Sequence, residues 1–162
     1  MPKKVALVAI CHNHLEITKK FVESVLRELD SNYDLYILDN GSSDGTHEYL
    51  LSVARETSNK VGVYVYKSDI NKGFAGGNNL LINEVFRRNI ACLELADYSN
   101  IILINNDTLV TKKAIEELVK VCNSDEEIAA TGPISNNVGG MQLLKQLYKV
   151  KDTEYKQIAE DI

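Results

Sequence analysis

The stretch with the clearest chemical potential is IILINNDTL, residues 101–109, in which an aliphatic run leads into two amides, a carboxylate and a hydroxyl. Carboxylate and amide oxygens are ligands for hard cations such as Mg²⁺ and Mn²⁺, which also take oxygens from substrate phosphates. Asn and Asp are equally common where a strand turns towards a helix. From these residues alone, Asn105, Asn106 and Asp107 form either a turn or part of a metal site.

Polar groups also follow other aliphatic runs. Asp39 ends the run YDLYIL, and because it lies several residues before the next helix, both a turn role and a contact with a ligand stay open. The segment NKGFAGGNN, residues 71–79, contains three glycines, which suit either close approach to a ligand or an ordinary turn. His12 and His14 lack a third ligand nearby, so a loop contact is favoured over zinc.

Strands and helices alternate along the chain. Short aliphatic runs rich in β-branched residues predict strands buried on both faces, at residues 5–10, 33–38, 61–66, 101–104 and, shorter, 127–132. Helical spacing of apolar residues predicts helices at about 15–29, from the end of the turn 40–46 to about residue 56, at 78–89 and at 111–122, with Asn13 and Thr111 as N-caps of the first and last. The predicted fold class is α/β, a doubly wound and mostly parallel sheet with helices on both faces. Its strand ends meet at one edge, where ligands bind.

The composition fits one globular domain. The chain has 162 residues, of which 44% are hydrophobic and 25% charged. Its net charge of -5, with no Lys/Arg block, disfavours nucleic acid and anionic lipid as partners. Cys11, Cys92 and Cys122 form no CxxC pair, which predicts reduced thiols in a cytosolic protein. The chain has neither a signal-peptide cleavage pattern after Lys3 and Lys4 nor roughly 20 consecutive apolar residues that could span a membrane.

Four motifs in this order, VALVAICHNH, ILDNGSSDGT, NKGFAGGNN and ILINNDTLV, resemble the nucleotide-binding half of family 2 glycosyltransferases of the GT-A fold. The following TGPISNNVGGMQ is similar to a segment of bacterial members that build polysaccharide or rhamnan-type glycans, so the resemblance covers about Val5 to Gln142. It implies a Rossmann-like domain over residues 1–142 that binds a nucleotide-diphospho-sugar, followed by a tail of helical character over 143–162. An NAD-binding domain is disfavoured because CHNHLE, not a Gly-rich fingerprint, follows the first strand.

The resemblance also implies roles for single residues. His12 takes the place of the residue that stacks on the nucleobase, and Asp39 that of the acid that accepts from the base N–H. Asp107 matches the last acid of the family's Asp-X-Asp motif, which binds a divalent metal, Mn²⁺ or Mg²⁺. The implied substrate-binding residues are Cys11, His12, Asn13, Asp39, Lys72, Gly73, Asn78, Asn105 and Asn106.

The implied reaction is inverting, metal-assisted transfer of a sugar from a UDP- or dTDP-sugar to the hydroxyl of a glycan or lipid-linked acceptor. Asn105 and Asn106 leave one acid where the family commonly has two. Family members continue for about another domain-half that supplies the acceptor site and the general base. Because this chain ends at Ile162, we expect a truncated or donor-binding half with no identifiable catalytic base, in the cytoplasm or at the inner face of the membrane.

Two other functions compete with this prediction. The first is a non-catalytic nucleotide-sugar-binding or assembly module that needs a partner chain. The second is a nucleotidyltransferase, which would want a Gly/Arg/Lys-rich phosphate loop after the first strand, where this chain has CHNHLE. An apolar face left exposed where the second half packs would further predict a homo-oligomer.

Overall fold

The computed structural model describes residues 3–57, 61–91 and 97–133, which fall into two units. The first unit ends at Val110 and contains the sheet and three helices, and the second begins at Thr111. The predicted tail over 143–162 lies outside the described residues, as does Cys92. Cys11 and Cys122 are free thiols.

The sheet of the first unit is parallel throughout its described strands, which run in the order β3-β2-β1-β4. These strands are β1 (Lys4–Cys11), β2 (Tyr33–Asn40), β3 (Gly62–Ser68) and β4 (Tyr98–Asn105). The prediction of four strands in this part of the chain is therefore confirmed. The predicted fifth strand at 127–132 is wrong: these residues form no strand, and most of them are exposed rather than buried between layers.

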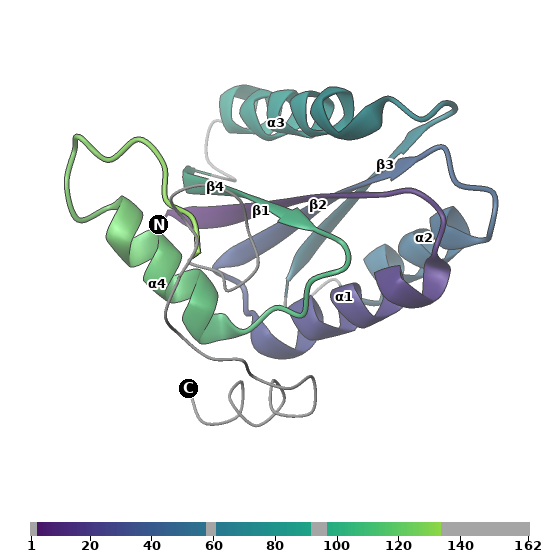
Figure 1. Cartoon of the computed structure of the whole chain (residues 1–162), viewed down its shortest axis with the longest axis horizontal. Coiled ribbons are helices and arrows are strands. Elements are labelled where there is room, and N and C mark those ends of the chain that lie inside the picture. Colours follow the sequence, from purple (N-terminus) through teal and green to yellow (C-terminus); the bar gives the residue numbers. More distant parts are fainter. Residues whose placement is uncertain (1–2, 58–60, 92–96, 134–162) are drawn as a thin grey trace, which may run out of the picture. The chain divides into compact units, whose positions relative to one another are not determined.

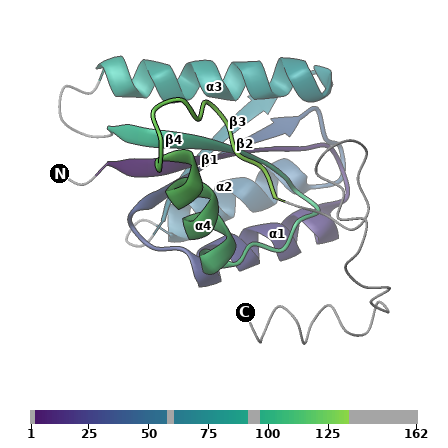
Figure 2. The ribbon, with the colours of Figure 1, turned by 60° about the vertical axis from the view of Figure 1, so that its left-hand side comes forward.

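Helices cover both faces of the sheet, as predicted. The helices of this unit are α1 (Leu15–Glu28), α2 (Thr46–Glu56) and α3 (Gly73–Ala91). Figures 1 and 2 show α1 and α2 on one face and α3 alone on the other. No described helix combines the length and the apolarity that crossing a bilayer requires.

Helix α3 begins five residues earlier than predicted, so most of the glycine-rich segment is helical rather than loop. Gly77 explains the choice of residue, because a Cβ there would lie 2.8 Å from Cδ1 of Ile10 and 3.2 Å from Cδ2 of Leu38. A side chain at this position would require the Ile10 and Leu38 side chains to shift. The glycines that suggested a loop thus serve close packing of α3 on the ends of β1 and β2.

The second unit contains α4 (Lys112–Cys122). Thr111 holds the N-cap position as predicted, although its side chain makes no capping hydrogen bond. The hydroxyl of Thr131 donates to the carbonyl of Leu118, 3.1 Å away, and ties the segment after α4 to the helix.

The predicted N-cap of α1, in the first unit, is wrong, since the residue at the N-cap position is His14 rather than Asn13.

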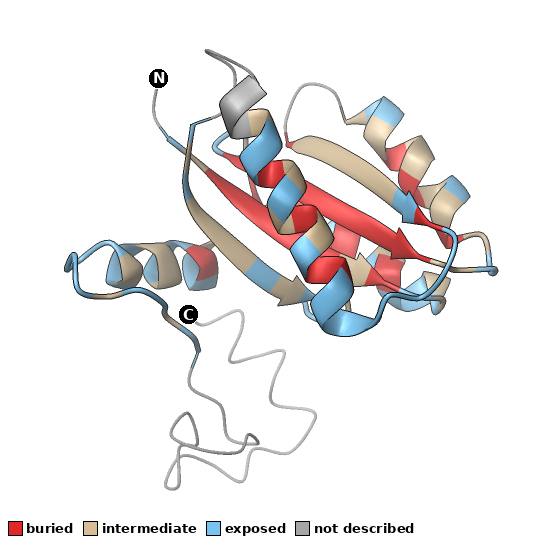
Figure 3. Cartoon of the chain, turned by 90° about the horizontal axis from the view of Figure 1, so that it is seen from above, coloured by how far each residue is buried: buried red, intermediate tan, exposed pale blue. Residues whose placement is uncertain are grey.

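Alternation along the central strands divides the core into two layers. Ala6, Val8, Tyr36 and Leu38 face α3, where they pack with Leu81 and Val85. The intervening residues point to the opposite face because successive side chains of a strand alternate. Figure 3 shows the resulting burial, with β1 and β2 buried almost throughout. The buried residues assigned to this opposite layer are Val5, Leu7, Ala9, Leu35 and Ile37, with Phe21, Val22, Val25 and Leu50 from α1 and α2.

A buried polar network lies in the α3 layer, near the amino ends of the strands. The Tyr98 hydroxyl donates to Oδ2 of Asp34 at 2.6 Å, and Lys4 Nζ donates to Oδ1 at 3.0 Å. The hydroxyls of Tyr36 and Tyr98 are hydrogen-bonded at 3.0 Å. Because the Tyr98 hydroxyl donates its proton to Asp34, the Tyr36 hydroxyl is the donor in this bond. Burial and the bond to Asp34 raise the pKa of Tyr98 well above its usual range. Because Asp34 is only 1% exposed, the network stabilises a carboxylate that would otherwise be costly to bury.

The Tyr98→Phe substitution should lower the free energy of unfolding by about 1.5–3 kcal/mol, the worth of a hydrogen bond to a charged group. The raised pKa means that this stabilisation is present below pH 10 and is lost as the pH rises above that value. The gap between the wild type and the variant in urea denaturation should therefore shrink from pH 8 to pH 11.

Tyr66→Phe is the matched control, because Tyr66 belongs to the same aromatic cluster and its hydroxyl makes no hydrogen bond with the described residues. Its effect should stay within about 0.5 kcal/mol. Equal losses for the two substitutions would contradict the role given to the Tyr98 hydroxyl.

Candidate functional site

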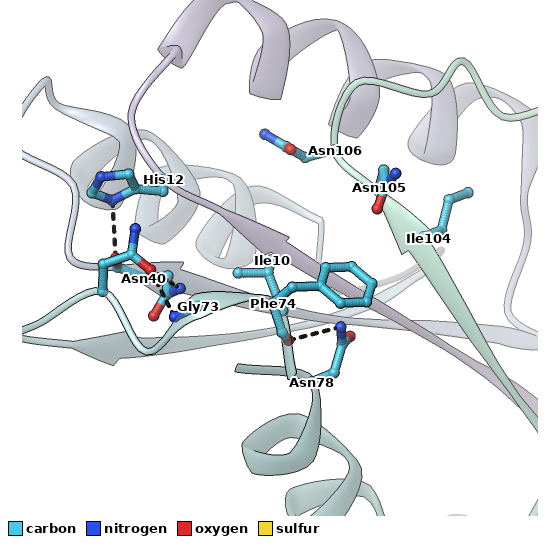
Figure 4. Close-up of a pocket in the computed structure, with 10 residues that line it drawn as sticks. Ile10, His12, Asn40, Gly73, Phe74, Asn78, Ile104, Asn105 and Asn106 are labelled. Atoms are coloured by element: carbon cyan, nitrogen blue, oxygen red, sulfur yellow. Dashed lines mark hydrogen bonds between the residues drawn. The ribbon is translucent and has the colours of Figure 1, made fainter. Parts of the chain in front are cut away.

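A pocket of about 310 Å³ opens at the carboxyl ends of the strands and the start of α3 (Figure 4). Half of its ten lining residues are asparagines, and three are apolar. The lining residues are Ile10, His12, Asn40, Asn71, Gly73, Phe74, Asn78, Ile104, Asn105 and Asn106. Strand ends of a parallel sheet are the usual place for a ligand, so this pocket is the candidate site.

The pocket is electrically neutral at pH 7 with a neutral histidine. Among the described residues that line it, none is Asp, Glu, Lys or Arg. Its polar atoms are amide groups, which both donate and accept hydrogen bonds. This lining suits an uncharged polar molecule, or the uncharged part of a larger one.

His12 is held by a backbone group. Its Nδ1 lies 3.0 Å from the carbonyl oxygen of Asn40, and because a carbonyl only accepts, Nδ1 carries the proton. Nε2 is then the acceptor of the neutral ring, 3.4 Å from Nδ2 of Asn13. The tautomer of this exposed imidazole is therefore set by its partners.

The backbone after His12 takes an unusual shape. Asn13 and His14 both have left-handed backbone angles, with φ of 55° and 57°. The β2–α2 loop supports them: Ser42 Oγ accepts from the Asn13 N–H at 2.8 Å, and Asn13 Oδ1 accepts from the Ser43 N–H at 3.0 Å. Left-handed residues persist where surrounding bonds compensate their cost. The side chain of Asn13 is thus used to hold the loop that carries His12.

Asp44 supplies the remaining support for this pair of loops. Oδ2 accepts from the Leu15 N–H at 2.9 Å, while Oδ1 accepts from the hydroxyl of Thr46 at 2.6 Å and from its N–H at 3.2 Å. These bonds, that from the Thr46 hydroxyl foremost, lower the pKa of Asp44. One carboxylate thereby joins the starts of α1 and α2.

Asp39 and Cys11 lie away from the pocket. They are paired across β1 and β2 and point to the face opposite that of Ile10 and Asn40. Burial, together with the nearby charge of Asp39, raises the pKa of the Cys11 thiol to about 12, and Sγ donates to the Leu38 carbonyl at 3.3 Å. Neither side chain lines the pocket, and the buried thiol is chemically inert.

The Asp39 carboxylate is fully buried and faces the β2–α2 turn. Oδ1 accepts from the Ser42 N–H at 3.0 Å, whereas Oδ2 has no hydrogen bond and lies 3.7 Å from Nδ1 of His47. The carboxylate therefore braces the turn whose Ser42 hydroxyl supports Asn13. Asp39 is thus linked to the loop that carries His12 through Ser42 and Asn13.

The turn after β4 contributes Asn105 and Asn106 to the pocket. Nδ2 of Asn106 donates to the Thr18 hydroxyl oxygen at 3.0 Å, which anchors the turn on α1. Asp107 is exposed and does not line the pocket. No group of three or more His, Cys, Asp or Glu side chains that could hold a metal occurs in the described part of the chain. Asp107 and its neighbours fit a hard cation only if a ligand's phosphate oxygens complete the set.

Part of the predicted site is brought together. His12, Gly73, Asn78, Asn105 and Asn106 line the pocket, whereas the side chains of Cys11, Asn13, Asp39 and Lys72 do not. Five lining residues were not among the predicted site residues: Ile10, Asn40, Asn71, Phe74 and Ile104. Alternation would have revealed Asn40, since it shares a face with Tyr36 and Leu38 in the layer beneath α3.

Comparison with known proteins bears on what this pocket does. The family model described as Glycosyl transferase family 2 matches residues 6–159. A hyaluronan synthase of Streptococcus pyogenes is 28% identical over 153 residues, which cover 91% of this chain and 33% of the relative. The chain thus spans about a third of the length of the curated relatives it matches.

Solved structures share the fold. Pyrobaculum calidifontis mannosyltransferase PcManGT, in complex with GDP-Man and Mn²⁺, has a TM-score of 0.61 at 14% identity, covering 76% of this chain and 33% of that one. S. aureus TarS 1–349, in complex with UDP, has a TM-score of 0.56 at 13% identity, covering 74% and 32%. The predicted GT-A fold is confirmed.

Asp44→Ala should lower the free energy of unfolding by about 1 kcal/mol, because it removes an acceptor for the first N–H groups of two helices. The lowered pKa of Asp44 means that this stabilisation is present above about pH 4 and is lost as the pH falls further. Urea denaturation at pH 7 and pH 3 measures both effects. Asp69→Ala is the control, because it removes an exposed carboxylate with no partner among the described residues. It should leave the free energy of unfolding unchanged at both pH values. A loss as large as that of Asp44→Ala would contradict the stabilising role given to the Asp44 carboxylate.

Proposed function

Because the chain belongs to glycosyl transferase family 2, we propose that it binds a nucleotide-diphospho-sugar in the asparagine-lined pocket and takes part in glycosyl transfer. The observation that carries the proposal is the position of this neutral pocket at the carboxyl ends of the parallel strands. TarS in complex with UDP and PcManGT in complex with GDP-Man support a nucleotide-linked sugar as the ligand. The proposed donors are UDP- or dTDP-sugars, and the proposed acceptor is a glycan or a lipid-linked glycan.

The proposed reaction inverts the anomeric carbon. The acceptor hydroxyl oxygen bonds to that carbon as the bond to the diphosphate oxygen breaks, and a base takes the hydroxyl proton. We assign no residue of this chain as the base. If the chain binds a donor without transferring its sugar, it serves as a nucleotide-sugar-binding module that completes its site with a partner chain.

Asp107 is the proposed metal ligand. Its exposed carboxylate, in the turn next to two lining residues, leaves room for phosphate oxygens to share a cation with it. A bound Mg²⁺ or Mn²⁺ would stabilise the negative charge of the departing nucleotide diphosphate. PcManGT in complex with Mn²⁺ supports the choice of a divalent ion.

Calorimetric titration with UDP, dTDP and GDP, each with and without Mn²⁺, tests donor binding. We expect the wild type to bind nucleotide more tightly with Mn²⁺ than without it. In the presence of Mn²⁺, Asp107→Asn should weaken nucleotide binding about tenfold, or ~1.4 kcal/mol. Glu48→Gln is the control, since it removes an exposed carboxylate of α2, outside the pocket lining. No nucleotide binding by the wild type would overturn the proposed function, whereas unchanged Mn²⁺ dependence in Asp107→Asn would overturn only the metal assignment.

A transfer assay separates the enzyme from the binding module. The wild type is incubated with a UDP-sugar, Mn²⁺ and oligosaccharide acceptors, and NMR of any product gives its anomeric configuration. Inversion supports the proposed reaction and retention contradicts it. Binding without product favours the module.

A further inference from the structure

The core-facing side of α1 contains two hydroxyl groups. The buried residues of this helix are Thr18, Phe21, Val22, Ser24 and Val25, of which the threonine and the serine are the polar members. Thr18 is 0% exposed and Ser24 is 1% exposed. A hydroxyl buried in a core costs free energy unless it finds a hydrogen-bond partner. The partners of these two residues therefore show what they add to an otherwise apolar face.

Both hydroxyls bond to one short segment, the residues that follow β4. Nδ2 of Asn106 donates to Thr18 Oγ1 at 3.0 Å. At the other end of the segment, the backbone N–H of Val110 donates to Ser24 Oγ at 3.0 Å. The Ser24 hydroxyl itself donates to the Phe21 carbonyl at 2.7 Å, so towards Val110 it acts as an acceptor. The segment, which runs from the end of β4 to α1 in Figure 1, is thus anchored on this helix at both ends.

The anchored segment carries the proposed metal ligand. Asp107 lies between the two anchors, in a turn that the Thr108 N–H closes by donating to the Asn105 carbonyl at 3.2 Å. Asp107, Thr108 and Leu109 are all exposed, whereas Val110 is 2% exposed. The three exposed side chains add nothing to the core, so the two ends of the segment hold it in place.

A fixed position matters for Asp107 because it is the one acid of this segment. The residues before it are the amides Asn105 and Asn106. Ordering a mobile side chain or loop at the moment of binding weakens affinity, and a turn that is already held in place avoids this cost. A single carboxylate therefore gains from support that a mobile turn would not give it.

We propose that Thr18 and Ser24 are positioning residues for the cation site: by fixing both ends of the segment after β4, they hold Asp107 where it can share a divalent cation with the phosphates of the donor. The inference rests on the proposed function and on the assignment of Asp107, and it adds the residues that support this ligand. Neither hydroxyl lines the pocket, so both act through the turn rather than on the ligand.

Thr18→Val tests the first anchor, because valine has the shape of threonine without the hydroxyl. Calorimetry gives the Kd of UDP with Mn²⁺ and with EDTA, and the ratio of the two values is the enhancement by Mn²⁺. Thr18→Val should lower this enhancement about threefold to fivefold, because the freed turn has to be ordered on binding. A direct effect of the freed Asn106 amide on the pocket changes both Kd values and cancels in the ratio. Thr18→Ser keeps the hydroxyl and should keep the enhancement.

Ser24→Ala tests the second anchor independently. It leaves the buried N–H of Val110 without its acceptor, so the enhancement should fall to a similar extent. Ser52→Ala is the matched control: the Ser52 hydroxyl on α2 donates to the Tyr49 carbonyl at 2.7 Å, as that of Ser24 does to Phe21. None of the described N–H groups after β4 donates to Ser52, so this substitution should leave the enhancement unchanged.

Hydrogen exchange of the wild type covers the case that a buried variant does not fold. Val110 lies outside the described helices and strands, and its N–H is bonded to Ser24. The neighbouring N–H of Leu109 has no acceptor among the described residues. We expect the Val110 N–H to exchange much more slowly than that of Leu109. Equal rates at the two positions would overturn the anchor at Ser24 and the inference with it.

The outcomes separate the inference from the function beneath it. If the wild type binds no nucleotide, the proposed function fails and the inference with it. If the wild type binds UDP more tightly with Mn²⁺ and Thr18→Val and Ser24→Ala keep the full enhancement, the inference is overturned while the proposed function stands. A loss in Thr18→Ser as large as in Thr18→Val, or a loss in Ser52→Ala, would indicate a general effect on packing and would also overturn it.

Discussion

Successive side chains of a strand point to opposite faces, and in a sheet covered on both faces this alternation decides which strand-end groups can reach a ligand. At the end of β2 the rule separates two neighbours. Asn40 points to the face of α3 and lines the pocket, while Asp39 points to the face of α1 and α2. This division places the Asn40 amide in the lining of the pocket and the buried Asp39 carboxylate outside it.

The two faces perform different tasks at this edge of the sheet. On the side of α1 and α2, Asp39 and Asp44 brace the loops through Ser42, Thr46 and Leu15. On the side of α3, amides lie open in a pocket. Burying a carboxylate is costly unless hydrogen bonds satisfy it, and Asp39 accepts one such bond, from the Ser42 N–H to Oδ1, while Oδ2 has none among the described residues. The loops so braced keep two left-handed residues beside His12 in place.

The sequence predicted the fold better than the site. Strand and helix alternation was legible because a parallel sheet buries both faces of its strands, which leaves continuous aliphatic runs. The start of α3 was misjudged because glycine indicates a loop locally, whereas Gly77 is needed for close contact with Ile10. The segment 71–79 was singled out by its glycines, but the hydrogen bond between Asn71 and Asn40 could not be predicted, since the two residues lie 31 positions apart in the sequence. The predicted contact of Asp39 with a ligand stays a prediction: its carboxylate is buried on the face of α1 and α2, and spacing alone does not tell which face a strand-end residue takes.

The charge distribution argues for a division within the ligand. A net charge of -5 repels a nucleotide diphosphate at long range, so affinity must come from local contacts. The lining amides can supply such contacts through their hydrogen-bonding groups, and amides whose orientation is fixed by other hydrogen bonds lose little freedom when a ligand binds. In the proposed arrangement the charged end of the ligand is bound through a cation that its phosphates share with Asp107. The neutral pocket would then contact the uncharged part of the ligand, so the two ends of one molecule are held by different kinds of interaction.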